Sequence, residues 1–310
     1  MKDPRRTATA RLHRAMMRKP AIDVPGMIEA ICAGANVNAP GEGGRTALML
    51  AACRDLPSVV PILLNHAARP EQTDRIGKTA LTFAAWHGST VVTDLLLAAG
   101  ANPHHRDAAG MTPMLYAAWN GHHPVLRRLL EHGADPEAID PDGWSPLTYA
   151  AAYGHPTTAR VLLDRAVIVD RPNHAGTTPL MLAVLHGHAG PVRALLAHGA
   201  DVRRRGADGT SLLQLLARGE TNPDLVAPLL DAGADPTATA MDGGGTILED
   251  FASHPDLLAA LDAALATPRH AAVRTRVLQG LSPQRAARDL PRASAAQAAT
   301  RLSWRRRSTS

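Results

Sequence analysis

The chain has 310 residues, of which 45% are hydrophobic and only 3% aromatic, so we expect a core built mainly of alanine and leucine side chains. It contains no apolar run of about 18 residues and no charged-then-apolar leader with a cleavage site. We therefore expect neither a membrane span nor a secretory signal, and a cytoplasmic, intracellular protein.

Charge is distributed unevenly along the chain, although the formal net charge is only +5. Residues 1–23 carry seven basic and two acidic residues, and residues 268–310 carry ten arginines and one aspartate. The residues between them are acidic, with a net charge near −9. Basic clusters attract anionic partners. The candidate anion-binding residues of the C-terminal cluster are Arg301, Arg305, Arg306 and Arg307.

The first residues predict a basic, flexible segment over 1–6 and a capping unit over 7–39. A helical pattern runs through Leu12 and Met16, and a second helix is predicted from Ile22 to Ala33. The pair lacks the start signal of the units that follow. It is therefore typical of the terminal units that shield the open end of a stacked array.

A unit of 33 residues then recurs, and it is clearest from Arg106 to Ala138. Thr112 is a typical N-cap and Pro113 suits the first position of a helix, which ends at Asn120-Gly121. A second helix is predicted from Pro124 to His132, followed by a turn-rich connector. Strict self-similarity at this period indicates stacked units. The landmark glycines, each 33 residues from the next, are Gly44, Gly77, Gly110, Gly143, Gly176 and Gly209.

Three motifs repeat in register. They are G-x-T-P-L at Gly176–Leu180, A-A-x-x-G-H at Ala117–His122 and L-L-x-x-G-A-D at Leu129–Asp135. The chain resembles the ankyrin repeat family through these motifs. The resemblance implies an all-α solenoid of helix-turn-helix units with β-hairpin-like connecting loops, in a single elongated stack.

The register sets the predicted boundaries. Two units replace the helix-ending glycine by Ala67 and Ala166, where a left-handed backbone should cost about 1 kcal/mol. The sixth unit is one residue longer around Glu220–Pro223, which predicts looser stacking there. Six repeats are predicted at 40–72, 73–105, 106–138, 139–171, 172–204 and 205–238, then a capping unit at 239–267 and a basic, largely disordered tail at 268–310.

The resemblance to ankyrin repeats implies that a partner protein binds in a concave groove, which is formed by the hairpin tips and the exposed end of the first helix of each repeat. Mapped onto this chain, the predicted partner-binding residues are Arg75, Ile76, Lys78, Trp86, His87, Met111, Trp119, Asn120, Asp142, Trp144, Tyr153, His174, Leu185 and His186.

Aromatic residues are the most informative members of this set. Trp86 and Trp119 are equivalent residues one unit apart, and we expect them to be neighbours along the groove. Exposed aromatic residues are enriched at binding hot spots, but these could instead fill space left by alanines. By contrast, the repeat pattern predicts core positions for Phe83, Tyr116 and Tyr149.

Other site chemistry is not indicated. The resemblance assigns His122, His155 and His188 to backbone tethering, and the histidines and two cysteines match no metal spacing. No nucleophile elbow, phosphate-binding glycine loop or convergent carboxylate pair is present in context. We expect no catalysis, no metal and no cofactor.

The main hypothesis is a monomeric, non-enzymatic scaffold that binds an unidentified protein partner through the groove. The alternative is a nucleic-acid or anionic-surface binder that acts through the arginine-rich tail. The sequence does not identify the partner.

Overall fold

The computed structural model describes residues 4–17, 23–238 and 246–280, and all regular elements in these ranges are helices. The chain divides into two compact units. The first comprises residues 1–183 and 190–200, and the second comprises residues 184–189 and 201–310. Within the described ranges, no helix is both long and apolar enough to cross a membrane.

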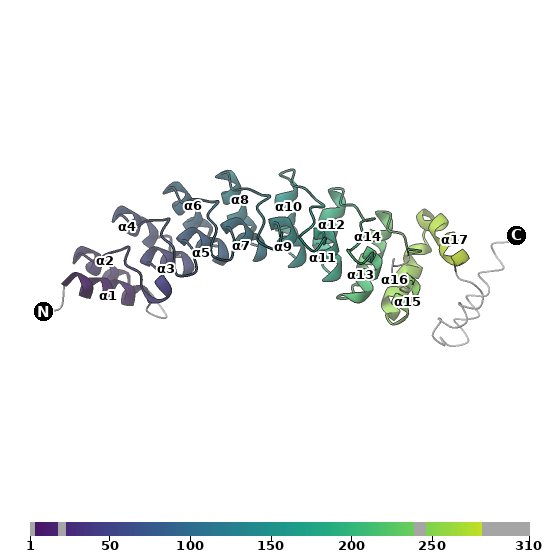
Figure 1. Cartoon of the computed structure of the whole chain (residues 1–310), viewed down its shortest axis with the longest axis horizontal. Coiled ribbons are helices and arrows are strands. Elements are labelled where there is room, and N and C mark those ends of the chain that lie inside the picture. The colour runs from purple at the N-terminus through teal and green to yellow at the C-terminus, as the bar shows by residue number, and fades with distance from the viewer. Residues whose placement is uncertain (1–3, 18–22, 239–245, 281–310) are drawn as a thin grey trace. The chain divides into compact units, whose positions relative to one another are not determined.

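The first unit consists of helix pairs whose first members lie side by side in one row and whose second members lie in another (Figure 1). The first row comprises α1 (Pro4–Met17), α3 (Ala47–Cys53), α5 (Ala80–His87), α7 (Pro113–Trp119) and α9 (Pro146–Ala152). The second comprises α2 (Val24–Cys32), α4 (Val59–Asn65), α6 (Thr90–Ala98), α8 (His123–Glu131) and α10 (Pro156–Leu163). Two further helices follow, α11 (Pro179–Leu185) and α12 (Ala189–Ala197).

Helix α7 begins where the sequence predicts. The hydroxyl of Thr112 accepts a hydrogen bond from the amide of Leu115, and Pro113 occupies the first turn of α7. Thr79 and Ser145 cap α5 and α9 in the same way. Because these helices are short, packing of their alanine-rich surfaces against the neighbouring helices must supply most of their stability.

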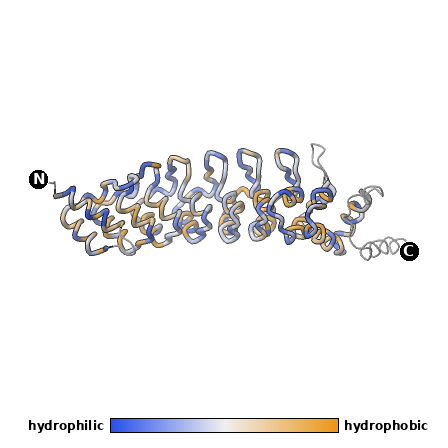
Figure 2. Tube along the Cα trace, turned by 90° about the horizontal axis from the view of Figure 1, so that it is seen from below, coloured by the Kyte–Doolittle hydropathy of each residue, from blue (hydrophilic) through white to orange (hydrophobic). Residues whose placement is uncertain are grey.

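Loops connect the second helix of one repeat to the first helix of the next, and Figure 2 shows them projecting from one side of the first unit. Backbone hydrogen bonds join consecutive loops: the amide of Arg75 donates to Gly43, and that of Ala108 donates to Ile76. Pro141 occupies the equivalent position in the next loop and has no N–H to donate. A short 3₁₀ turn, η1 (Glu42–Gly44), lies in the first of these loops.

Two alanines occupy the left-handed position that other repeats give to glycine. Ala67 has a φ of 60° and Ala166 a φ of 54°, whereas Gly133 at the equivalent position has a φ of 78°. The predicted left-handed backbone at both alanines is confirmed, a conformation that is costly for a residue with a Cβ atom.

The N-terminal end differs from expectation in one respect. Residues 4–6 belong to α1, although residues 1–6 were expected to be flexible. Leu12 and Met16 are fully buried where α1 packs against α2, so the helix is stabilised by its apolar side rather than by its basic start.

The second unit contains α13 (Leu212–Arg218), α14 (Val226–Asp231), α15 (Ile247–Ala252), α16 (Pro255–Leu265) and α17 (Ala271–Gly280), with 3₁₀ turns η2 (Pro223–Leu225) and η3 (Pro268–His270). Residues 268–310 were expected to be largely disordered, but residues 268–280 form η3 and α17. His270 and Val277 are 6% and 7% exposed, so η3 and α17 are packed parts of this unit.

The extra residue of the sixth repeat lies in an ordered turn of the second unit. The amide of Glu220 donates to the carbonyl of Leu185 at 2.8 Å, and the side-chain amide of Asn222 donates to Gly187 at 2.8 Å. In earlier repeats a histidine ring contacts the carbonyl that corresponds to that of Leu185, so in this repeat the backbone amide of Glu220 takes the place of the histidine.

Candidate partner-binding face

Six aromatic side chains in the first unit form one connected set, which we call the aromatic face: Trp86, Tyr116, Trp119, Trp144, Tyr149 and Tyr153. They come from α5, α7 and α9, the loop before α9 and the residue directly after it. These helices lie side by side, so rings separated by one repeat in the sequence come into contact.

Tryptophan and tyrosine rings alternate along the set, so each tryptophan contacts a tyrosine rather than the equivalent tryptophan of the next repeat. Tyr116 stacks on Trp86 with ring centroids 5.0 Å apart and an interplanar angle of 12°. Its other neighbour is Trp119, at 6.3 Å and 9°. The expectation that the two tryptophans are direct neighbours is therefore corrected: Tyr116 links them.

The set continues from Trp119 into the next repeat. Trp119 stacks on Tyr149 at 5.5 Å and contacts Tyr153 at 5.8 Å, while Trp144 contacts Tyr149 at 5.1 Å. The first pair is stacked and the other two are tilted, and aromatic pairs typically contribute about 0.5–1.5 kcal/mol beyond area burial. The rings are thus held in place by one another.

The predicted core positions are confirmed for Phe83, Tyr116 and Tyr149, which are 3%, 3% and 8% exposed. The buried location of Tyr116 and Tyr149 does not separate them from the aromatic face, because their rings contact those of the tryptophans. The sequence held a signal for this: Tyr116 precedes Trp119 by three residues, just as Phe83 precedes Trp86. One helical turn therefore places each pair on adjacent parts of the same helix.

Both buried tyrosines are anchored by an aspartate of their own repeat. The Tyr116 hydroxyl donates to Asp107 at 2.6 Å, and the Tyr149 hydroxyl donates to Asp140 at 2.7 Å. The other carboxylate oxygen of Asp107 accepts the amides of Ala109 and Met111, which fixes the loop as well. Burial, followed by the hydrogen bond to the aspartate, raises the pKa of each tyrosine well above its usual range.

A lysine lies beneath this surface. Lys78 is only 6% exposed, and its ammonium lies 3.5 Å from the ring centroid of Trp86. Burial lowers the pKa of Lys78, and the negative charges of Asp107 and Asp74 partly oppose that change. Lys78 was expected to contact a partner directly; burial makes it a support for the rings instead.

Met111 occupies the same position one repeat later and is 5% exposed. Its sulfur lies 3.7 Å from the Tyr149 hydroxyl oxygen, whose proton is donated to Asp140. The expectation that Met111 faces a partner is corrected, because its side chain is buried against Tyr149 of the following repeat. In the preceding repeat, Arg45 lies 4.9 Å from the Phe83 ring centroid.

The remaining predicted residues of the first unit lie at or near the surface. Trp86 is 37% exposed and Tyr153 is 47% exposed, whereas Trp119 and Trp144 are half-buried. The other exposed members are Arg75, Ile76, His87, Asn120, Asp142 and His174. Leu185 and His186 belong to the second unit, where both are half-buried.

Histidines fix the backbone at the edge of the aromatic face. A ring nitrogen of His122 lies 3.0 Å from the carbonyl of Trp86, and one of His155 lies 2.9 Å from that of Trp119. Tethering, which the resemblance implied, is confirmed for these two residues. Burial lowers the pKa of His122 despite its bond to the Trp86 carbonyl, so the ring is neutral at pH 7.

His87 lies beside Trp86, with ring centroids 6.3 Å apart, and its Nε2 is 3.3 Å from the Cys53 sulfur. Burial lowers the pKa of His87, and the positive charges of its neighbours, including Arg45 and Lys78, lower it further. Within the described residues, no group of three or more His, Cys, Asp or Glu side chains is placed to hold a metal ion.

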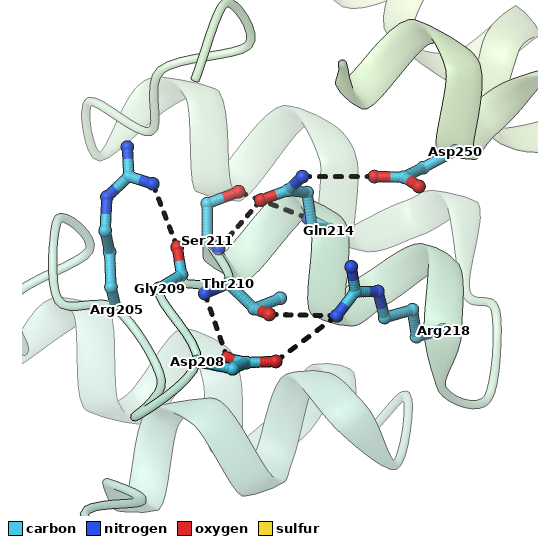
Figure 3. A network of polar contacts seen from close by, with 8 residues as sticks. All are labelled: Arg205, Asp208, Gly209, Thr210, Ser211, Gln214, Arg218 and Asp250. Atoms are coloured by element: carbon cyan, nitrogen blue, oxygen red, sulfur yellow. Dashed lines mark hydrogen bonds and ion pairs between the residues drawn. The ribbon is translucent and has the colours of Figure 1, made fainter. Parts of the chain in front are cut away.

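The second unit presents polar rather than aromatic chemistry in its first loop and helix (Figure 3). Arg218 contacts Asp208 at 3.4 Å and donates to the Thr210 hydroxyl at 2.9 Å. Gln214 is fully buried and donates to Asp250 at 3.2 Å. These bonds connect α13 to its preceding loop and to α15, which is a structural role.

The predicted anion-binding residues of the tail, Arg301, Arg305, Arg306 and Arg307, lie outside the described residues.

Comparison with protein families agrees with this architecture. A model of three ankyrin repeats matches residues 12–107 and 90–173, and a second model of ankyrin repeats matches residues 162–216. Repeated pairs of short helices, joined by loops that project from one side, are the architecture of a helical repeat protein. The chain belongs to the ankyrin repeat family, whose repeats are protein-interaction modules.

Among solved structures, the ankyrin repeat domain of human ASB11 is similar to this chain, with 25% sequence identity and a TM-score of 0.65. The similarity covers 72% of this chain and 100% of that domain. The comparison with curated proteins finds no match.

Proposed function

We propose that this chain is a non-enzymatic scaffold whose aromatic face binds an extended segment of a partner protein. The observation that carries the proposal is the continuity of the rings: they span three repeats and end in the exposed side chains of Trp86 and Tyr153. Scattered exposed apolar residues need no explanation, but a connected aromatic surface is typical of a binding site.

The rings are suited to act as anchors. Trp119 and Trp144 are half-buried among other rings, so they need little rearrangement when a partner covers them. Interface tryptophans and tyrosines often contribute about 2 kcal/mol or more each. A patch of about 800 Å² on this side would suffice for a specific complex.

Charge around the aromatic face favours an apolar segment with an acidic group at one end. Arg75 is exposed on the loop before α5, and Arg45 is half-buried over Phe83 in the preceding repeat. At the other end, Asp142 is exposed on the loop before α9. Opposite charges across an interface chiefly fix register and speed association. We therefore expect the acidic end of the segment to lie near Arg75.

The proposal can be tested by affinity capture from lysate with the full chain, followed by titration of the captured protein. Trp86→Ala and Tyr153→Ala should each weaken its affinity by about tenfold or more. The matched control, Val91→Ala with Ile168→Ala, removes side chains that are 55% and 56% exposed outside the aromatic face. Equal affinity of all the folded variants would exclude the aromatic face as the binding site.

A further inference from the structure

A concave surface lies at the N-terminal end of the first unit, and its lining includes no residue of the aromatic face. Helix α1 and the loop of residues 34–39 enclose a cleft of about 800 Å³, which we call the N-terminal cleft. From α1 it is lined by Arg5, Arg6, Thr9, Ala10 and His13, and His66 closes it from the end of α4.

The charged side chains among the described residues that line this cleft are all basic. Arg5 and Arg6 are exposed on the first turn of α1, and His13 lies further along the same helix. None of the described residues that line the cleft is an aspartate or glutamate. Burial lowers the pKa of His13, so the two guanidinium groups provide the permanent charge. A concave basic surface of this kind favours an anionic ligand.

The other repeats show what usually packs at this position. The amide of Asn102 donates to a carboxylate oxygen of Glu71 in the preceding loop, at 2.8 Å. Two repeats later, the amide of Ile168 donates to a carboxylate oxygen of Glu137 at 2.6 Å. The amide of Arg69 likewise donates to the side-chain oxygen of Asn38. In these three loops, the backbone is thus bonded by an acidic or amide side chain from the loop before it.

Asn36 occupies the equivalent place in the first loop, but its partner is different. Its amide donates to the hydroxyl of Thr9 on α1, at 3.0 Å. Thr9 in turn donates to the carbonyl of Arg5 at 2.9 Å. Among the described residues, therefore, a helix stands where later repeats have a preceding loop, and the N-terminal cleft is the space beside it.

We propose that the N-terminal cleft binds an extended, carboxylate-bearing segment of a partner protein, which packs beside residues 34–39 as a preceding loop packs in the other repeats. The guanidinium groups of Arg5 and Arg6 form ion pairs with its carboxylates, because Arg matches carboxylate geometry with paired donors. Thr9 and Asn36 hold the loop in the conformation that receives the segment.

The test uses a peptide of this chain's own connecting sequence, residues 134–143, which carries four carboxylates. Its neutral counterpart has Asn and Gln in place of the acidic residues. Binding of both to the full chain is measured by titration, together with the backbone NMR shifts of residues 34–39. We expect saturable binding of the acidic peptide, a shift of those signals, and no binding of the neutral peptide.

Two double variants separate this site from general charge attraction. Arg5→Gln with Arg6→Gln should weaken binding of the acidic peptide by about tenfold, that is about 1.4 kcal/mol. Arg11→Gln with Arg14→Gln removes the same charge from exposed positions of the same helix outside the cleft, and should change affinity little. Glutamine is nearly as good a helix former as arginine, so α1 should persist in both.

Three results would overturn the proposal: equal weakening by the two double variants, equal binding of the neutral peptide, or no saturable binding of the acidic peptide. Trp86→Ala should leave peptide binding unchanged, so the outcome is independent of the role of the aromatic face.

Discussion

The ammonium of Lys78 lies 3.5 Å from the ring centroid of Trp86 and 4.6 Å from that of Tyr116. One charged side chain thus covers two rings from consecutive repeats while remaining almost completely buried. The contact offsets part of the cost of removing the ammonium from water. It also links the loop before α5 to the aromatic face that we propose as the binding site.

Lys78→Met should therefore be tolerated, because Met111 performs the same packing one repeat later. A thioether retains contact with the rings and carries no desolvated charge. We expect the free energy of unfolding in urea to change by less than about 1 kcal/mol. Lys78→Ala, which uncovers both rings, should lower it by about 2 kcal/mol. Equal destabilisation by the two substitutions would show that the charge itself is required.

Tyr116→Phe should destabilise the first unit by about 1–3 kcal/mol, because the carboxylate of Asp107 loses its hydroxyl donor while it stays buried. Tyr153→Phe is the matched control, since Tyr153 is 47% exposed and its hydroxyl makes no hydrogen bond to the described residues. Urea unfolding of both variants measures the difference. A cost for Tyr116→Phe no greater than that of the control would contradict the anchoring role of Asp107.

Alkaline pH should destabilise the protein through Tyr116 and Tyr149. Burial and the bonds to Asp107 and Asp140 raise their pKa, so the folded state keeps both protons where the unfolded chain loses them, above about pH 10. The unfolded state then binds fewer protons, and stability falls as pH rises above that value. The free energy of unfolding measured from about pH 8 to 11 should fall less steeply in the Tyr116→Phe/Tyr149→Phe variant. The same slope in both proteins would contradict the assignment.

Two glycine substitutions should differ sharply in cost. Gly121 and Gly133 have φ values of 73° and 78°, so alanine strains the backbone at either position. At Gly121 a Cβ would also lie 2.5 Å from Nδ1 of His155, whereas at Gly133 no atom lies within 4 Å. Gly133→Ala should cost about 1 kcal/mol, and Gly121→Ala clearly more. Thermal unfolding of the two variants compares them, and equal melting temperatures would mean that the His155 tether is unimportant.

The repeat pattern predicted most of the fold because each signal acts locally. Thr112 and Pro113 start a helix through the backbone geometry of that helix alone, and Ala67 adopts the left-handed conformation that the register demands. The packed end of the second unit was missed because residues 268–280 lack the repeat motif. Their order comes from burial of His270 and Val277 against the unit, which no local pattern reveals.

The aromatic face was predicted in part. Trp86 and Trp119 occupy equivalent positions in consecutive repeats, and this predicted that they belong to one surface. The register does not show, however, which side chains extend from one repeat to contact the next. Lys78 and Met111 reach under neighbouring rings, and Tyr116 inserts between the tryptophans. The N-terminal cleft depends on how α1 packs against the loop of residues 34–39, and that arrangement could not be inferred from the repeat pattern.

Hydroxyl-radical footprinting of the full chain, with and without its captured partner, tests the central claim most directly because it needs no substitution. Trp86 and Tyr153 are exposed on the aromatic face, and Met17, which is 47% exposed on α1, serves as an internal reference. We predict that the partner slows oxidation of Trp86 and Tyr153 and leaves that of Met17 unchanged. Unchanged oxidation of both aromatic residues in the saturated complex would contradict the proposal that the partner binds this face.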